Sequence, residues 1–304
     1  MKHVRGGKQR RAELALAGIT VVWGTTFVVV KGALADVSPV LFIALRFTLA
    51  FVALALIYGT GLRQKGIPRT AWLAGLLAGT LLFGAYVLQT IGLGLTTPSK
   101  SAFLTSLSIP MVPLTGSVVY GNRPRALEGA GIVIASFGMI LMTLPGNMMS
   151  AGFSVNRGDL LTFFCAVLFA VHIVVIGHFS PVIGFESLAV VQIAVAAVLA
   201  LVFVFFLALR APVTFHPTAG LATAVLVTGL LATGLAFTTM AWAQQYTSST
   251  RAALIFALEP VVAWLTSWLL TGEIMGIRGT AGAGLILAGI LLVEFKPDLK
   301  RVKP

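Results

Sequence analysis

The chain has 304 residues, of which 58% are hydrophobic and only 10% are charged. Soluble domains carry about 25% charged residues, so this composition excludes an ordinary soluble protein and indicates an integral membrane protein. The formal net charge is +12, but the basic residues cluster at the N-terminus, in one short loop and in the C-terminal tail. That distribution fits a lipid bilayer with anionic headgroups rather than a nucleic-acid surface, so no nucleic-acid partner is predicted.

Ten apolar runs are long enough to cross a membrane, because a transmembrane helix needs about 20 mostly apolar residues. The first run follows a basic stretch, as in a signal peptide, but it is too long for one and is predicted to remain as a helix. Short turns separate the runs, so we expect an all-α integral membrane protein without a soluble domain. The predicted spans are 13–34, 39–58, 71–95, 99–121, 126–144, 158–179, 185–209, 218–244, 248–271 and 276–294.

The basic residues predict how the spans are oriented. An even number of spans places both termini on one side of the membrane. With the termini inside, the inner segments hold fifteen of the 21 Lys and Arg residues, the outer segments hold five, and Arg46 lies within a span. Because short cytoplasmic loops carry an excess of Lys and Arg, both termini are predicted to be cytoplasmic.

The two halves of the chain align with each other at offsets of 146, 150 and 151 residues, in that order. The matched pairs include Glu13 with Asp159, Arg46 with Gln192, Thr97 with Thr247, Ile109 with Glu259, Pro110 with Pro260, Gly121 with Gly272, Gly131 with Gly282 and Gly138 with Gly289. Each half has five spans, an odd number, so the halves lie in opposite orientations. We therefore predict ten transmembrane helices in a five-plus-five inverted-topology repeat. Residues 1–147 and 148–304 form the two repeats of one compact transmembrane unit.

Several motifs occur in an order that is typical of one family. The start holds VVWGTTFVVVKGAL (21–34). In each half a turn of small residues leads into a proline-bearing helix, GLTTPSKSAFLTSLSIP (94–110) and QYTSSTRAALIFALEP (245–260), and the second half ends this helix with LTGE (270–273). Over its whole length the chain resembles the EamA-type branch of the drug/metabolite transporter superfamily, although Asn122 stands where LTGE has Glu273. The basic N-terminus and aromatic-rich spans are most similar to YddG-type exporters of aromatic and other amino acids.

Three ionisable residues lie clearly within predicted spans, where charge is costly and functional roles are common. Arg46 is a candidate to bind a substrate carboxylate, with a structural pair or snorkelling as the alternative. His172 is a candidate proton-sensitive or hydrogen-bonding group, or a histidine satisfied by a neighbouring helix. Glu259 could bind a substrate ammonium, pair with Arg46, exchange a proton, or satisfy backbone donors where Pro260 breaks the helix.

Further candidates are charged residues near helix ends, prolines within spans, and polar or aromatic residues within spans. Lys31, Asp36, Lys100 and Arg251 lie near helix ends, and solvated or headgroup-facing positions are expected for them. Pro110 and Pro260 are predicted to break or kink helices near the membrane centre, where a cavity or a neighbour satisfies the freed backbone. The complete predicted cavity lining is Trp23, Thr26, Arg46, Tyr86, Gln89, Ser106, Phe169, His172, Gln192, Thr239, Trp242 and Glu259.

These features predict a secondary active or facilitative transporter that exports amino acids, aromatic or other hydrophobic, or related small metabolites by alternating access. Its predicted location is the inner (plasma) membrane of a bacterium. The resemblance leaves other solutes open, such as drugs, cations or nucleotide-like metabolites. It also leaves open whether a proton is coupled and whether the protein is a monomer or a homodimer.

The rival classes are an intramembrane enzyme and a structural membrane subunit. An intramembrane enzyme needs a nucleophile–base pair or two carboxylates at one depth, and Glu259 is the only well-buried acid predicted here. There is no G-x-x-x-x-G-K-[ST] phosphate loop for ATP, and the single cysteine, Cys165, excludes an internal disulfide. No catalytic residue, metal or cofactor is therefore predicted.

Overall fold

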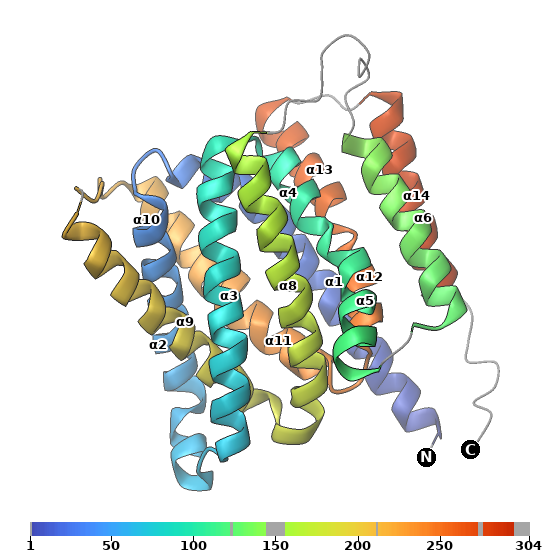
Figure 1. Ribbon diagram of the computed structural model, residues 1–304, viewed down its shortest axis with the longest axis horizontal. Coiled ribbons are helices and arrows are strands. Elements are labelled where there is room, and N and C mark those ends of the chain that lie inside the picture. The colour runs from blue at the N-terminus through green and yellow to red at the C-terminus, as the bar shows by residue number, and fades with distance from the viewer. Residues whose placement is uncertain (1, 122–123, 144–155, 211, 273–275, 295–304) are drawn as a thin grey trace.

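The computed structural model describes residues 2–121, 124–143, 156–210, 212–272 and 276–294. Nearly all of this described chain is helical, and its only β-type pairing is an isolated bridge between Val37 and Phe215. The helices run side by side in one bundle (Figure 1). The prediction of an all-α membrane protein is therefore confirmed.

Each helix lies close to the position that its apolar run predicted. The first half contains α1 (Lys2–Ala33), α2 (Pro39–Lys65), α3 (Arg69–Leu95), α4 (Pro98–Ser106), α5 (Ser108–Tyr120) and α6 (Ala126–Thr143). The second half contains α8 (Arg157–Ile183), α9 (Phe185–Ala208), α10 (Ala219–Leu226), the π-helix η1 (Val227–Leu235), α11 (Ala236–Ala243), α12 (Ser249–Phe256), α13 (Glu259–Thr271) and α14 (Ile277–Glu294). Asn122, Glu273 and the predicted boundary between the repeats at 147/148 lie outside the described residues.

Eight helical segments of the described chain are long and apolar enough to cross a membrane. Three of these segments each consist of consecutive helices: α4 with α5, α10 with η1 and α11, and α12 with α13. Two shorter apolar helices correspond to α6 and α14 and lie side by side at one edge of the bundle (Figure 1). Their positions match the predicted fifth and tenth spans, and the count of ten spans stays a prediction.

The fourth and ninth spans are broken at corresponding places. A 3₁₀-type hydrogen bond from Leu107 N to Leu104 O separates α4 from α5, and one from Leu258 N to Ile255 O separates α12 from α13. Pro110 and Pro260 lie just after the breaks, in the first turns of α5 and α13. Proline is tolerated there because the first N–H groups of a helix have no partner within it.

The helix caps correct the register of the repeat in this region. Thr97 caps α4 by accepting from Lys100 N, and Ser248 caps α12 by accepting from Arg251 N. Thr97 therefore corresponds to Ser248, at an offset of 151, and the sequence match of Thr97 with Thr247 was wrong by one residue. The reason is that Thr247 and Ser248 are adjacent hydroxyl residues, and either could cap a helix. Only the backbone of the structure shows that Ser248 is the cap.

The same offset continues to the ends of α5 and α13. Both helices have 13 residues and end at a left-handed glycine, Gly121 with φ 68° and Gly272 with φ 72°. Glycine is the residue that adopts this backbone at no steric cost. By this register the counterpart of Glu259 is Ser108, the first residue of α5, rather than Ile109.

Glycines bring α6 and α14 into reciprocal contact. A Cβ placed on Gly138 would lie 2.6 Å from the carbonyl oxygen of Gly282, and one on Gly289 would lie 2.6 Å from that of Gly131. The sequence repeat matches Gly131 with Gly282 and Gly138 with Gly289, so each glycine contacts the repeat counterpart of the other glycine on its own helix. Contacts exchanged in this way arise when two equivalent elements are related by a two-fold axis.

This contact predicts a loss of stability when either glycine gains a side chain. Gly138→Ala should lower the free energy of unfolding by about 1–3 kcal/mol, the usual cost of overpacking, because the new methyl group meets backbone that cannot move aside alone. The matched control is Gly284→Ala on α14, where a Cβ meets nothing within 4 Å. Thermal unfolding in detergent should show a lower midpoint for Gly138→Ala only. Equal midpoints for the two variants would contradict the contact.

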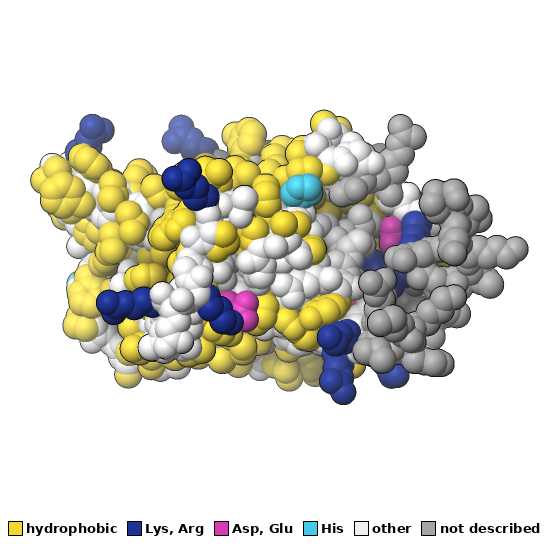
Figure 2. Space-filling view, turned by 90° about the horizontal axis from the view of Figure 1, so that it is seen from below, with side chains coloured by type: hydrophobic (Ala, Val, Ile, Leu, Met, Phe, Trp, Pro, Cys, Tyr) yellow, Lys and Arg dark blue, Asp and Glu magenta, His cyan; other side chains and the backbone are white. Residues whose placement is uncertain are grey.

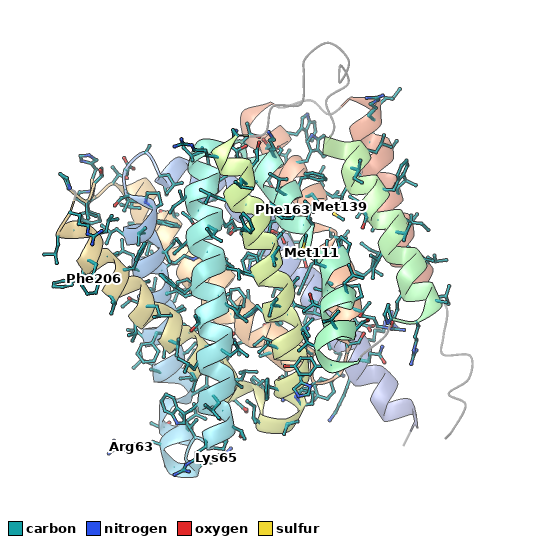
Figure 3. All side chains as sticks on the ribbon, viewed as in Figure 1. Arg63, Lys65, Met111, Met139, Phe163 and Phe206 are labelled. Atoms are coloured by element: carbon teal, nitrogen blue, oxygen red, sulfur yellow. The ribbon has the colours of Figure 1, made fainter. Side chains whose placement is uncertain are left out.

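The surface separates into apolar flanks and basic ends. Phe206 on α9 points away from the bundle, whereas Arg63 and Lys65 stand at the end where α1 begins (Figure 3). Figure 2 looks at that end and shows Lys and Arg side chains spread across it, with hydrophobic side chains around the flanks. We call this end of the bundle the α1 end.

Candidate functional site

A cavity lies at the centre of the bundle, between residues of both halves. Its volume is about 60 Å³, which is far below the roughly 300–1,000 Å³ of typical ligand pockets. Nine of the twelve predicted lining residues border it: Trp23, Thr26, Arg46, Tyr86, Gln89, Ser106, Phe169, His172 and Glu259. The structure therefore brings most of the predicted residues together, in a contracted space that must widen to hold a solute.

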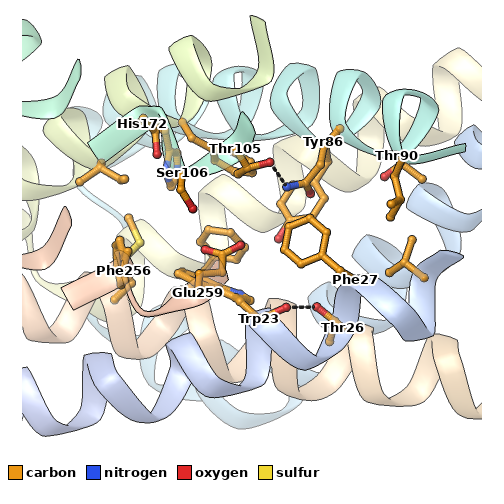
Figure 4. Close-up of a pocket in the computed structure, with 18 of the residues that line it drawn as sticks. Trp23, Thr26, Phe27, Tyr86, Thr90, Thr105, Ser106, His172, Phe256 and Glu259 are labelled. Carbon is orange, nitrogen blue, oxygen red and sulfur yellow. Dashed lines mark hydrogen bonds between the residues drawn. The ribbon is translucent and has the colours of Figure 1, made fainter. Parts of the chain in front are cut away.

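Glu259 is the acidic side of the cavity. It is the first residue of α13 and points from that helix into the cavity, with Ser106 and His172 on the facing wall (Figure 4). Among the described residues its carboxylate has no hydrogen-bond or ion-pair partner. The N-terminus of a helix carries a partial positive charge, which stabilises an anion at this position. Glu259 thus presents a carboxyl group to the cavity that is available to a ligand.

Arg46 is the basic side of the cavity. Its side chain is only 3% exposed. Nε and Nη2 donate to Thr233 Oγ1 at 3.0 and 2.8 Å, and the guanidinium carbon lies 4.3 Å from the ring centroid of Tyr86. No carboxylate of the described chain pairs with it, so the alternative in which Glu259 pairs with Arg46 is not formed. A buried cation held by one hydroxyl and one aromatic face has capacity left for an anion.

The anchor of Arg46 lies on a π-helix. Thr233 belongs to η1, and its hydroxyl also donates to Thr228 O at 2.8 Å, five residues back. The Trp23 indole donates to Ala232 O on the same segment at 2.8 Å. Gly229 lets α2 approach, since a Cβ there would lie 3.1 Å from the Arg46 carbonyl oxygen. π-Helical turns are rare and often mark functional sites, and here one positions two cavity residues.

His172 borders the cavity and is fixed from behind by Gln192. The distance from His172 Nε2 to Gln192 Oε1 is 2.9 Å, and both side chains are fully buried. An amide oxygen only accepts, so in this arrangement Nε2 carries the proton and Nδ1 is the free acceptor. Gln192 was predicted to line the cavity, but it lies outside it because the imidazole stands between.

A polar wall and an aromatic wall complete the cavity. Gln89 Nε2 on α3 donates to Thr105 Oγ1 on α4 at 3.1 Å. Phe237 is the centre of the aromatic wall, with ring centroids 5.3 Å from Trp23, 6.0 Å from Tyr86 and 5.6 Å from His172. Aromatic faces of this kind provide flat apolar contact and attract cations.

Two further predicted residues do not line the cavity. Thr239 and Trp242 were chosen on the eighth span, but Phe237 and Met240 occupy the cavity side of it, and Trp242 packs on Tyr246 at 5.6 Å. The preceding π-helix has i→i+5 hydrogen bonds and therefore more residues per turn than an α-helix. A projection based on 3.6 residues per turn consequently selects the wrong side chains beyond η1.

The sequence reasoning also missed lining residues that a helical stripe reveals. On α1, Phe27 and Val30 line the cavity together with the predicted Trp23 and Thr26. On α3, Thr90 and Leu93 line it together with the predicted Tyr86 and Gln89. These positions repeat at i, i+3, i+4 and i+7, which is one face of a helix. The remaining missed residues are Thr105, Ser108, Ile109, Ile173, Phe237, Met240 and Phe256.

A second hollow opens toward the α1 end of the bundle. This vestibule has a volume of about 660 Å³, and its lining includes Gln9, His178, Gln244 and Arg251. On α8, Ile173 borders the cavity and the adjacent Val174 borders the vestibule. On the eighth span, Met240 borders the cavity and Gln244, one turn later, borders the vestibule. Since one helical turn rises about 5.4 Å, only a thin layer of side chains separates the two spaces.

Comparison with known proteins gives the family. The model of the EamA-like transporter family matches twice, at residues 10–144 and 156–295. These matches begin 146 residues apart and end 151 residues apart, the offsets at which the halves align with each other. Two copies of one family unit therefore occupy the chain.

Relatives of this chain include transporters whose substrates their names do not give. An uncharacterized transporter of Archaeoglobus fulgidus is 31% identical over 293 residues, which cover 96% of this chain and 88% of the relative. The uncharacterized inner membrane transporter YedA of Escherichia coli is 28% identical over 137 residues, 44% of each chain. The uncharacterized transporter YoaV of Bacillus subtilis is 23% identical over 295 residues, 95% of this chain and 98% of the relative.

A solved crystal structure shows that the fold is known. It aligns with a TM-score of 0.73 at 21% identity, over 93% of this chain and 96% of its own. Together with the two family matches and the 31% identical relative, the bundle and its central cavity show that this chain is a membrane transporter of the EamA-like transporter family.

Proposed function

We propose that this transporter exports amino acids, aromatic or other hydrophobic, across the inner (plasma) membrane of a bacterium by alternating access. The observation that carries the proposal is a pair of opposite charges in one cavity that do not pair with each other. Arg46 is held by Thr233 and Tyr86, and Glu259 has no partner in the described chain. An amino acid is a small zwitterion, and its carboxylate and ammonium complement these two groups.

Energetics support this assignment. An unpaired charge inside a membrane protein is costly, so a ligand with an ammonium and a carboxylate would stabilise both Glu259 and Arg46 as charged groups. Arginine suits a carboxylate because its planar guanidinium offers parallel donors. The ring faces of Trp23, Tyr86 and Phe237 would contact an apolar or aromatic side chain of the ligand.

The layout of the two hollows supports alternating access. The cavity reaches Val30 and Leu93, near the ends of α1 and α3, whereas the vestibule opens at the other end. One turn of side chains separates them, and each half supplies a broken span at the cavity. Inverted repeats with discontinuous helices at a central site are the usual arrangement of secondary transporters. Placing the α1 end in the cytoplasm, as the basic residues favour, makes the vestibule the entrance for export.

Growth of bacteria under challenge tests the proposal. Cells that overproduce the protein should tolerate several-fold more of a toxic aromatic amino acid analogue such as p-fluorophenylalanine than cells producing the double variant Arg46→Met/Glu259→Gln. Tolerance of a toxic organic cation without a carboxylate should be equal in the two strains. Greater protection against the cation than against the analogue would instead favour an exporter of organic cations, in which Glu259 alone recognises the solute.

A further inference from the structure

We propose that two sets of ion pairs, one set at each end of the bundle, act as opposing latches that hold the two halves together and open in turn. The proposal builds on alternating access as the proposed function. The α1-end latch joins Arg251 to Glu13 and Glu128, and the latch at the opposite end joins Lys100 to Asp159. Sequence reasoning expected Lys100 and Arg251 to be solvated, and the structure shows them paired instead.

The α1-end latch connects α12 of the second half to two helices of the first. Arg251 Nη1 lies 3.2 Å from Glu13 Oε1 on α1, and Nε lies 3.5 Å from Glu128 Oε1 on α6. Thr247 Oγ1 also donates to Glu13 Oε1, at 3.2 Å. The side chains are mostly buried, with exposed fractions of 16% for Arg251, 10% for Glu13 and 9% for Glu128. Separating α12 from α1 and α6 would break all of these contacts.

The opposite latch connects α4 of the first half to α8 of the second. Lys100 Nζ lies 2.6 Å from Asp159 Oδ2, and Thr96 Oγ1 donates to Asp159 Oδ1 at 3.1 Å. Asp159 also forms a capping box with Asn156 at the start of α8, which fixes the carboxylate. Separating α4 from α8 would break the contact with Lys100 while leaving the capping box in place.

The two latches are the same device in the two repeats. Glu13 corresponds to Asp159 at the offset of 146, and Thr96 corresponds to Thr247 at the offset of 151. Lys100 and Arg251 are each the third residue of their helix, and each donates its backbone N–H to the N-cap hydroxyl. Because the repeats are inverted, equivalent contacts fall at opposite ends of the molecule (Figure 1). Opening the α1 end separates α1 from α12. The equivalent motion at the opposite end separates α8 from α4.

The latches differ in one member. Glu128 adds a second carboxylate at the α1 end, whereas the equivalent position at the offset of 151 is Gly279. The α1-end latch is also the more buried, since the Lys100 side chain is 31% exposed. Removing one partner of a buried ion pair leaves an uncompensated charge, and partial exposure weakens the effect through screening. The α1-end latch therefore loses less to solvent screening, whereas the Lys100–Asp159 contact is the shorter one, at 2.6 Å against 3.2 and 3.5 Å.

Cysteine accessibility tests the latches without any substrate. In a Cys165→Ala background, one reporter is Val112→Cys in the vestibule and another is Leu93→Cys at the far end of the cavity. The protein is placed in nanodiscs, where a hydrophilic maleimide reaches both ends. Arg251→Gln should raise the labelling rate of Val112→Cys several-fold and lower that of Leu93→Cys. Lys100→Gln should produce the reverse.

The controls separate a latch from a general effect of charge or folding. Arg63→Gln removes an exposed charge at the α1 end and should leave both labelling rates unchanged. If Arg251→Gln fails to fold, Glu13→Gln is used instead, because it weakens the contact between Arg251 and Glu13 and keeps the ion pair between Arg251 and Glu128. Asp159→Asn keeps an acceptor for the capping box and should reproduce Lys100→Gln, with no added effect in the double variant. The proposal is contradicted if the labelling rates do not change, or if both variants change the labelling rates of both reporters in the same direction. Because labelling needs no solute, that result would leave the proposed substrate untouched.

Discussion

Replacing Glu259 with glutamine should weaken the transport of amino acids by about tenfold or more. The change keeps the size and shape of the side chain but removes the negative charge that we assign to the substrate ammonium. A hydrogen bond to a charged group contributes about 1.5–3 kcal/mol, and each 1.4 kcal/mol is a factor of ten in affinity. The measurement is the concentration dependence of phenylalanine counterflow in proteoliposomes, where the half-saturating concentration should rise.

The control for this variant is a neutral change in the same cavity. The Thr26 hydroxyl donates to Trp23 O within its own helix, at 2.7 Å, so Thr26→Val should alter phenylalanine counterflow by less than the charge change does. A carboxylate that lacks the ammonium, such as 3-phenylpropionate, should not lose affinity in Glu259→Gln. Equal losses for phenylalanine and 3-phenylpropionate would show that Glu259 acts on the helix break and not on the substrate.

Replacing Arg46 with methionine should have the second large effect, a loss of selectivity for the carboxylate. Wild-type protein should prefer phenylalanine to phenethylamine, which has the same ring and ammonium but no carboxylate. Methionine keeps the apolar length of the side chain and removes the donors, so the preference should fall about tenfold or more, by the same charge-assisted hydrogen-bond energy. Competition of the two solutes for counterflow gives the ratio directly and is insensitive to the amount of protein.

Variants of the Arg46 anchor distinguish recognition from folding. Thr233→Val removes the acceptor that orients the guanidinium but leaves the charge, and it should cause a smaller loss of preference than Arg46→Met. Arg46→Lys keeps the charge without the planar fork and should also be intermediate. If all three variants lower the unfolding midpoint and transport without changing the ratio of the two solutes, Arg46 is a structural residue.

The apolar runs and the repeat were readable from the sequence because each depends on local composition. A helix that crosses lipid must satisfy its own backbone, so length and hydropathy locate it closely. Pro110 and Pro260 indicated the broken spans for the same reason, since proline removes a backbone donor wherever it occurs. The glycine pairs of α6 and α14 were found as sequence matches, and the structure adds that Gly138 contacts Gly282 and Gly131 contacts Gly289.

The finer features depended on information that one sequence does not contain. Nothing in residues 227–235 signals a π-helix, and this is why Phe237 and Met240 were missed. The partners of Lys100 and Arg251 lie 59 residues and more away in the chain, so their pairing becomes visible only in the packed bundle. The repeat match of Thr97 with Thr247 was wrong by one residue because Thr247 and Ser248 are adjacent hydroxyl residues and only the backbone shows which one caps α12.

The central claim is that one cavity recognises both charges of a zwitterion, and flux of three matched solutes tests it most directly. Proteoliposomes with the wild-type protein would be loaded with equal concentrations of phenylalanine, phenethylamine and 3-phenylpropionate, and the efflux of each measured against protein-free liposomes. The account predicts protein-dependent efflux of phenylalanine at least about tenfold faster than that of either analogue, since each analogue leaves Arg46 or Glu259 unpaired. Efflux of phenethylamine or 3-phenylpropionate as fast as that of phenylalanine, or no efflux of phenylalanine, would contradict it.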